Sequence, residues 1–144
     1  MITSTTTLVP DNPAAAYAAY RQAASAVFLA GTQGLKYKKD HYDLAVDLSK
    51  AGMQYIEERE DDIVIGAMTP LWQIKISPVI QEFAGGAISK AISDVADKNV
   101  QRYGTLGGVI SGKAPFSVLL PILLSLHVDV QLQDKGCMSL DDYL

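Results

Sequence analysis

Ala26-Val-Phe-Leu-Ala-Gly-Thr-Gln-Gly34 is the stretch that most directly indicates the fold. Its first five residues are apolar and too few for an ordinary helix, which favours a short buried strand. The strand then ends in Gly31-Thr-Gln-Gly34, a turn rich in residues that permit unusual backbone angles. A glycine loop after a buried strand lets the backbone approach a phosphate group, with its amide hydrogens pointing inward.

The residues before this strand predict a helix with a defined start. Asp11-Asn-Pro13 supplies a capping side chain followed by proline at the first helical position. Strong helix formers continue from residue 14 to about residue 25. Residues 1–8 are rich in Ser and Thr, without a basic stretch or an apolar core. We therefore predict a flexible N-terminal tail over residues 1–8 and no signal peptide.

The residues after the glycine loop alternate between strand and helix patterns. Alternation of apolar and polar residues predicts strands over residues 43–48, 53–58, 63–68 and 128–132. Proline positions and helical spacing predict helices over residues 70–74, 87–96 and 116–126, with a short one after Ser77-Pro78. The two strands joined by the acidic residues 57–62 must pair antiparallel. The pattern therefore favours an α+β fold over a doubly wound sheet.

Length and composition exclude several classes of protein. The 144 residues fit one domain, and 49% hydrophobic against 19% charged residues argues against disorder. Twelve basic and 16 acidic residues leave a net charge of −4, which argues against a general nucleic-acid binder. The single cysteine, Cys137, forms no internal disulfide and fits a reducing compartment. No apolar run is long enough for a membrane helix. We therefore expect a cytoplasmic protein with neither a nucleic-acid nor a membrane partner.

A second glycine-dense stretch, Gly104-Thr-Leu-Gly-Gly-Val-Ile-Ser-Gly112, is predicted to form a loop directly before a helix. Two glycine loops from distant parts of the chain could clamp an extended dinucleotide, although either loop alone is more often an ordinary turn. Residues 107–113 also match most of a P-loop. Ala114 stands where that motif needs Ser or Thr for magnesium, so we interpret the match as fortuitous.

The remaining reactive residue types do not group into a catalytic or metal site. His41 and His127 have no partner nearby in sequence, and the acidic run 57–62 lacks the spacing of a calcium loop. Trp72 is expected in the core. We predict no catalytic residue and no metal ligand, so any redox chemistry would belong to a cofactor.

The order of these segments resembles a known family over about residues 10–144. Phe28-Leu-Ala-Gly-Thr-Gln-Gly-Leu35, Ile63-Val-Ile-Gly-Ala-Met-Thr69 and Asn99-Val-Gln-Arg-Tyr-Gly-Thr-Leu-Gly-Gly108 follow one another along the chain. Similar segments occur in the FAD-binding domain of the flavin subunit of molybdenum hydroxylases, the xanthine dehydrogenase and carbon monoxide dehydrogenase type. The ending Met138-Ser-Leu-Asp-Asp-Tyr143 is similar as well. The ordered match is more specific than any one segment.

The resemblance implies a two-subdomain FAD-binding domain over residues 9–144, with a small parallel strand–helix part and an antiparallel strand part. It implies an oxidoreductase subunit, not active alone, in which FAD relays electrons beside a molybdenum-cofactor subunit and an iron–sulfur subunit. In that family both loops wrap the FAD, with backbone amides on the pyrophosphate. Carried onto this sequence, the cofactor-binding residues are Ala30, Gly31, Thr32, Gln33, Gly34, Leu35, Gly104, Thr105, Gly107, Gly108, Ala114 and Pro115.

Departures from the family pattern keep a second hypothesis open. The first loop reads Ala30-Gly-Thr-Gln-Gly34 where the family has Ala-Gly-Gly-Thr-Asp, and a positive φ at Thr32 would cost about 1 kcal/mol or more. Val109 and Val118 replace an Asn and an Asp of the family, and the C-terminal domain usual in the family is expected to be absent. The alternative is a degenerate, cofactor-free relative that acts as a structural or assembly subunit.

Overall fold

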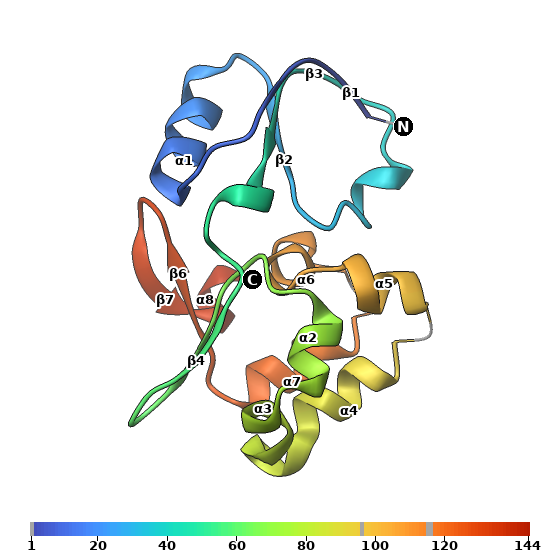
Figure 1. Ribbon diagram of the computed structural model, residues 1–144, viewed down its shortest axis with the longest axis vertical. Helices are drawn as coiled ribbons and strands as arrows, with labels where there is room; N and C mark the ends of the chain where they lie inside the picture. Colours follow the sequence, from blue (N-terminus) through green and yellow to red (C-terminus); the bar gives the residue numbers. More distant parts are fainter. Residues whose placement is uncertain (1, 96, 115–116) are drawn as a thin grey trace.

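The computed structural model describes residues 2–95, 97–114 and 117–144. Figure 1 shows two halves, one above the other. The upper half holds a three-stranded sheet with a helix beside it, and the lower half is mostly helical. Two antiparallel hairpins complete the fold. The predicted α+β class, with a parallel part and an antiparallel part, is confirmed.

The sheet of the upper half is parallel throughout, in the order β1-β3-β2. Its strands are β1 (Thr3–Leu8), β2 (Ala26–Leu29) and β3 (His41–Asp47). The predicted helix is α1 (Pro13–Gln22), and it begins as expected, since the side chain of Asn12 accepts a hydrogen bond from the N–H of Ala15 at 2.8 Å. The ring of Tyr20 on α1 stacks on Phe28 of β2 at 4.4 Å, which fixes the helix against the sheet.

The flexible tail predicted for residues 1–8 is wrong for residues 3–8. These residues form β1, which pairs with β3 from Thr3 opposite His41 to Leu8 opposite Val46. Thr has a high strand propensity because of its β-branched side chain. The hydroxyls of Thr3 and Thr5 also lie 2.9 and 3.2 Å from the two ring nitrogens of His41. β1 lies at the edge of the sheet, and most of its side chains are exposed to solvent. Its residues are therefore polar, and a polar segment at the start of a chain looks like a flexible tail in sequence.

Two hairpins follow the predicted strand positions. β4 (Ile56–Glu58) pairs antiparallel with β5 (Ile63–Ile65). Of the acidic residues 57–62 predicted to connect the two strands, residues 59–62 do so, whereas Glu57 and Glu58 belong to β4. Both strands are shorter than predicted, because residues 53–55 and 66–68 belong to the segments that lead into the centre of the molecule. Near the C-terminus, β6 (Asp129–Leu132) pairs antiparallel with β7 (Gly136–Ser139).

The lower half is built from short helices around one apolar cluster. The most deeply buried members of this cluster include Leu71, Ile74, Ile80, Ile92 and Leu119. Burial of such side chains is the main source of stability for helices this short, since isolated short helices are marginal in water. The helices are α2 (Leu71–Ile76), α3 (Pro78–Glu82), α4 (Ala87–Ser93), α5 (Lys98–Tyr103), α6 (Leu106–Gly112), α7 (Leu119–Ser125) and α8 (Leu140–Tyr143). Three 3₁₀ turns connect neighbouring elements: η1 (Leu35–Tyr37) lies between β2 and β3, η2 (Leu48–Lys50) between β3 and β4, and η3 (Phe83–Gly86) between α3 and α4.

Two further expectations are corrected. The second glycine stretch is not a loop, since residues 106–112 form α6. The side chain of Thr105 caps this helix by accepting from the N–H of Gly108, and the cap outweighs the low helix propensity of three glycines. Trp72 is 43% exposed on α2 and does not belong to the core, because Leu71 and Ile74 occupy the buried face of this helix.

Candidate functional site

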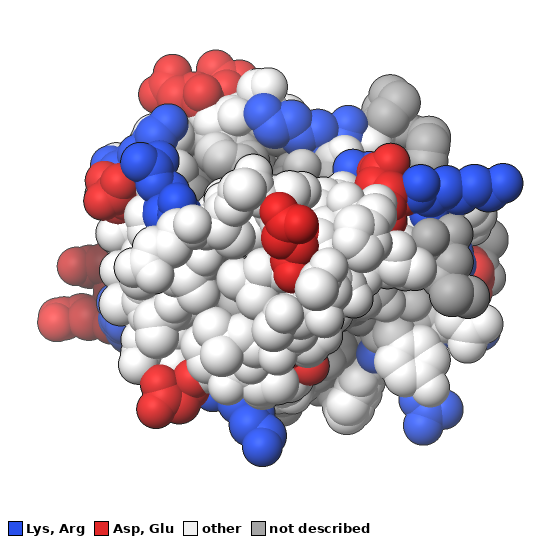
Figure 2. Space-filling model, turned by 90° about the horizontal axis from the view of Figure 1, so that it is seen from above, with Lys and Arg blue, Asp and Glu red and all other residues white. Residues whose placement is uncertain are grey.

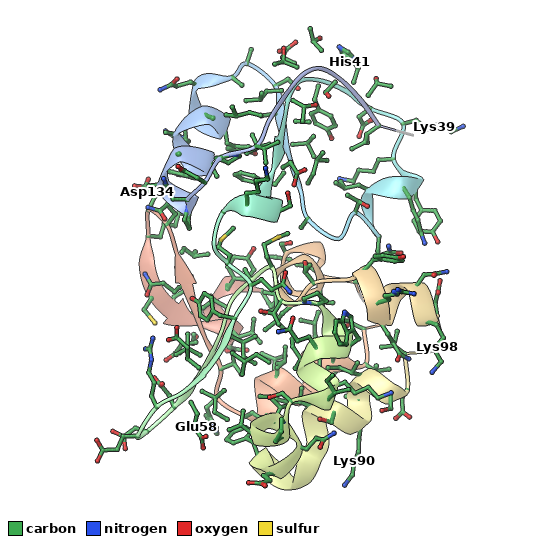
Figure 3. All side chains as sticks on the ribbon, viewed as in Figure 1. Lys39, His41, Glu58, Lys90, Lys98 and Asp134 are labelled. Atoms are coloured by element: carbon green, nitrogen blue, oxygen red, sulfur yellow. The ribbon has the colours of Figure 1, made fainter. Side chains whose placement is uncertain are left out.

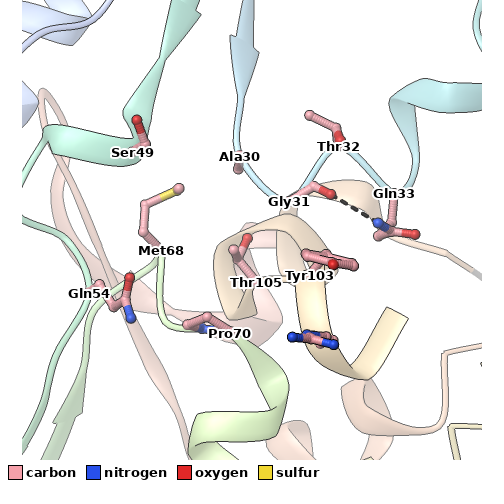
Figure 4. A pocket seen from close by; sticks show the side chains of 11 residues that line it. Ala30, Gly31, Thr32, Gln33, Ser49, Gln54, Met68, Pro70, Tyr103 and Thr105 are labelled. Carbon is pink, nitrogen blue, oxygen red and sulfur yellow. Dashed lines mark hydrogen bonds between the residues drawn. The ribbon is translucent and has the colours of Figure 1, made fainter. Parts of the chain in front are cut away.

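An open pocket of about 470 Å³ lies where the ends of β2 and β3 meet the helical half. Its size is typical of small-molecule and cofactor sites. Figure 4 shows the loop after β2 above Tyr103 and Thr105, with Ser49 and Met68 on the opposite wall. The pocket is lined by Ala30, Gly31, Thr32, Gln33, Ser49, Gln54, Met68, Pro70, Arg102, Tyr103 and Thr105.

Gly31 joins the two halves of the pocket by direct backbone contact. A Cβ atom at Gly31 would lie 1.9 Å from the carbonyl oxygen of Tyr103 and 3.0 Å from the Cα of Gly104. No other residue type fits this approach, because backbone atoms cannot move aside as a flexible side chain would. The glycine therefore brings together the loop after β2 and the end of α5.

Thr32 holds a strained backbone conformation at the pocket rim. Its φ of 55° lies in the left-handed region, which costs a β-branched residue about 1–2 kcal/mol. The carbonyl of Thr32 accepts hydrogen bonds from the N–H groups of Leu35 at 3.1 Å and Lys36 at 3.2 Å. The side chain of Gln33 donates to the carbonyl of Gly31 at 3.2 Å (Figure 4). These bonds keep the loop in the strained form.

The backbone N–H groups of this loop have no partner within the described part of the chain. Those of Gly31, Thr32, Gln33 and Gly34 donate to neither a backbone carbonyl nor a side chain there. Successive free N–H groups around a left-handed residue are the arrangement that binds anions in many proteins. The loop predicted from sequence to face a phosphate is thus equipped to do so.

In the second glycine segment, by contrast, the backbone N–H groups have acceptors within the protein. The N–H of Leu106 donates to Thr69 at 3.1 Å, that of Gly107 to Ala67 at 2.8 Å, and that of Gly108 to the Thr105 hydroxyl at 3.2 Å. A Cβ at Gly107 would lie 2.8 Å from the carbonyl oxygen of Ala67. These glycines therefore allow α6 to pack against residues 67–69, and their amides are already used within the protein.

The predicted site residues separate into three groups. Ala30, Gly31, Thr32, Gln33 and Thr105 line the pocket. Gly104 accepts a hydrogen bond from the N–H of Leu71 at 2.9 Å behind the lining. The other described members, which continue the first loop or belong to α6 and its C-terminal side, lie outside the lining: Gly34, Leu35, Gly107, Gly108 and Ala114. Pro115 lies outside the described residues.

Six lining residues are absent from the set that the sequence predicted. Ser49 is placed by η2, whose turn is capped by the Asp47 carboxylate accepting from the N–H of Ser49 at 2.8 Å. Met68 and Pro70 flank Thr69, whose buried hydroxyl both accepts from the N–H of Tyr55 and donates to its carbonyl. The other three are Gln54, Arg102 and Tyr103. Met68, Arg102 and Tyr103 lie in segments that carried the family resemblance, a signal that could have placed them in the site.

Other titratable groups do not gather around this pocket. Figure 3 shows the labelled side chains, among them His41, Glu58 and Lys98, pointing outward at separate places around the molecule. The pKa of Tyr42 is raised by desolvation and by the neighbouring Asp40 carboxylate, but Tyr42 lies on β3 outside the lining. Lys113, which ends the P-loop-like stretch 107–113, donates to the carbonyls of Tyr143 at 2.8 Å and Leu144 at 3.2 Å.

Comparison with known proteins identifies the family of the chain. A family model described as the FAD binding domain in molybdopterin dehydrogenase matches residues 3–144. The chain belongs to this family. FAD is the cofactor of the family, and the match includes β1, which the sequence analysis had left out of the domain.

Two curated proteins are similar to this chain in sequence. The nicotinate dehydrogenase FAD-subunit of Eubacterium barkeri is 30% identical over 131 residues, which is 86% of this chain and 44% of that protein. The uncharacterised protein YgfM of Escherichia coli is 28% identical over 121 residues, 83% of this chain and 45% of YgfM. The chain thus spans about half the length of the curated relatives it matches.

A crystal structure of the Cu,Mo-CO dehydrogenase in its cyanide-inactivated form shares the fold. It superposes with a TM-score of 0.84 at 23% identity and covers 99% of this chain and 52% of that one. Among the described residues, no helix is long and apolar enough to cross a membrane.

Proposed function

We propose that this chain binds FAD in the pocket between its two halves. The bound flavin would relay electrons within a multi-subunit oxidoreductase of the molybdenum hydroxylase type. The observation that carries the proposal is the row of backbone N–H groups of Gly31, Thr32 and Gln33, which line the pocket, and of the adjacent Gly34, all without a protein acceptor among the described residues. The family match and the FAD-subunit name of the Eubacterium relative support the same cofactor.

The pocket lining fits a ligand that is anionic at one end and flat and apolar at the other. The loop amides would hold the diphosphate, because backbone N–H groups bind anionic oxygens without the cost of ordering a long side chain. Met68, Pro70 and Tyr103 offer apolar and aromatic surface for a ring system. Ser49 and Gln54 add hydrogen-bonding groups on the opposite wall.

The chain's own residues bind and orient, and the flavin supplies the redox chemistry by accepting and returning electrons. Among the lining residues there is no His, Cys, Asp, Glu or Lys, so the described pocket holds no pair of groups for acid–base catalysis. The partners implied by the family, a molybdenum-cofactor subunit and an iron–sulfur subunit, would provide the substrate chemistry and the electrons.

The proposal is tested by the visible spectrum of the purified protein after addition of FAD and desalting, in a matched pair of variants. Gly34→Pro removes one free N–H, and the φ of −75° at Gly34 suits proline. Gly34→Ala keeps the N–H, and its Cβ would have no atom within 4 Å. We expect retained flavin in wild type and Gly34→Ala, and roughly five- to tenfold weaker binding in Gly34→Pro.

A wild-type protein that stays colourless with excess FAD would contradict the proposal. It would favour the second function, a cofactor-free structural or assembly subunit. One observation already fits that function, namely that the amides at the start of α6 are all used within the protein. Stable association with a partner subunit in the absence of flavin would then be the expected result.

A further inference from the structure

The pocket differs in charge from the protein that surrounds it. The whole chain is acidic, with a net charge of −4. Figure 2 shows acidic and basic side chains interspersed on the face seen from above the sheet half. Among the residues that line the pocket, however, Arg102 is the one charged side chain, and no Asp or Glu is present. A pocket with one cation and no carboxylate selects for an anionic ligand.

Arg102 lines the same pocket as Gly31, Thr32 and Gln33. It lies in the last turn of α5, and its guanidinium sits 5.7 Å from the centre of the Tyr103 ring. The carbonyl of Tyr103 is the group that packs directly against Gly31. Arg102 is therefore the neighbour in sequence of the residue whose backbone joins α5 to the glycine loop.

The guanidinium of Arg102 has free hydrogen-bond donors. Within the described residues no carboxylate lies within ion-pair distance of it, and the ion pair found there joins Arg59 to Glu57 on the far hairpin. Its N–H groups have no hydrogen-bond acceptor in that part of the chain either. An arginine presents a rigid fork of donors that matches two oxygens of a phosphate group.

We propose that Arg102 is the residue that makes this pocket specific for a diphosphate-containing flavin over an uncharged one. The inference rests on the proposed FAD site and adds the group that determines selectivity within it. The loop amides supply directional hydrogen bonds, whereas Arg102 supplies one full positive charge against the two negative charges of the diphosphate. Riboflavin lacks any phosphate, so its binding does not depend on Arg102.

The test measures dissociation constants of the full chain for FAD, ADP and riboflavin by calorimetry at low and high salt. Arg102→Gln removes the charge and Arg102→Lys keeps it without the fork. Arg21→Gln is the matched control, because Arg21 lies in the last turn of α1 outside the pocket lining. We expect Arg102→Gln to weaken FAD and ADP binding roughly tenfold and Arg102→Lys roughly threefold. Riboflavin binding stays unchanged in every variant, and Arg21→Gln behaves as wild type.

High salt provides an independent readout. The difference between wild type and Arg102→Gln for FAD and ADP should shrink as salt rises, because an exposed charge is screened by counterions. A merely structural role for Arg102 would lower the thermal midpoint and weaken all three ligands alike. An unchanged midpoint with selective loss of FAD and ADP supports the inference.

The failures are distinguishable. If wild type binds FAD and Arg102→Gln binds FAD and ADP as tightly, the role of Arg102 is overturned while the FAD site stands. If Arg102→Gln weakens riboflavin to the same extent, the charge selectivity is overturned. If wild type binds neither FAD nor ADP, the proposed function is overturned and this inference with it.

Discussion

The two glycine-rich segments look alike in sequence and differ in what their backbone does. In the loop after β2, the N–H groups from Gly31 to Gly34 have no partner among the described residues, and Gly31, Thr32 and Gln33 line an open pocket. At the start of α6, the N–H groups from Leu106 to Gly108 all donate to acceptors within the protein. One segment is available to a ligand, and the other fastens α6 to residues 67–69.

This difference shows that glycine content alone does not identify a phosphate loop. At Gly31 and Gly107 the missing Cβ makes room for another backbone, with distances of 1.9 and 2.8 Å to the nearest carbonyl oxygen if a Cβ were added. At Gly34 a Cβ would meet nothing within 4 Å. The glycines that pack the protein and the amides that remain free for a ligand are therefore partly different residues.

The largest effect is expected for Gly31→Ala. The added Cβ would overlap the Tyr103 carbonyl, so the loop and α5 must separate, at a cost of about 3 kcal/mol of unfolding free energy. Both stability and flavin binding should fall, as measured by urea unfolding and by the visible spectrum. Gly34→Ala is the control and should change the unfolding free energy little. A Gly31→Ala protein as stable as wild type would show that the two segments do not depend on this contact.

Gly107→Ala should lower the unfolding free energy by about 1–2 kcal/mol, because its Cβ would crowd the Ala67 carbonyl. Unlike the change at Gly31, it should leave FAD bound in the fraction that remains folded. Gly112→Ala, where a Cβ meets nothing within 4 Å, is the matched control on the same helix. Loss of flavin from a fully folded Gly107→Ala protein would place α6 in the binding surface and erase the distinction between the segments.

Thr105→Ala should lower the unfolding free energy by about 1 kcal/mol through loss of the α6 cap. Thr105→Ser keeps the hydroxyl that accepts from Gly108 and should restore most of this stability. Thermal unfolding of the three proteins measures the difference. Equal stability of the Ala and Ser variants would mean that the cap contributes nothing and that packing alone holds α6.

The smallest effect is expected for Thr32→Gly. Relief of the left-handed strain at Thr32 is worth about 1–2 kcal/mol and the added flexibility of glycine costs about 0.5–1 kcal/mol, so a net gain near 0.5 kcal/mol is expected. Thr32→Ala keeps most of the backbone strain and serves as the comparison. A destabilised Thr32→Gly protein would mean that the threonine side chain itself stabilises the loop.

Local patterns predicted much of the secondary structure correctly. Asn12 and Pro13 marked the start of α1, alternation located β3 and both strands of the first hairpin, and apolar spacing located α4. The strand β1 was missed because its polar threonines pair with β3, a partner distant in sequence. Helix α6 was missed because its cap and its contacts with residues 67–69 outweigh the low helix propensity of glycine.

Part of the candidate site was predicted, namely the residues that carry a signal in the local sequence. Ala30, Gly31, Thr32, Gln33 and Thr105 carry a local glycine-loop or capping signal and do line the pocket. Gln54 carries no such signal, and Arg102 has only its place in a segment similar to the family, because a polar side chain on a surface element looks the same in sequence whether it faces a pocket or solvent. Their positions in the pocket lining depend on how α5 and the residues before β4 pack in the folded chain.

The amino-acid sequence by itself determined the α+β class, the family and the glycine loop after β2, since each depends on residues that are neighbours along the chain. Tertiary structure determined which backbone amides lack an acceptor within the protein and which glycines allow close packing of two backbone segments. It also determined that Arg102 is the one charged side chain that lines the pocket. These properties depend on contacts between segments far apart in sequence, such as Gly31 with Tyr103 and Gly107 with Ala67. A hydrogen bond between such segments uses up a donor that the local sequence alone would offer to a ligand.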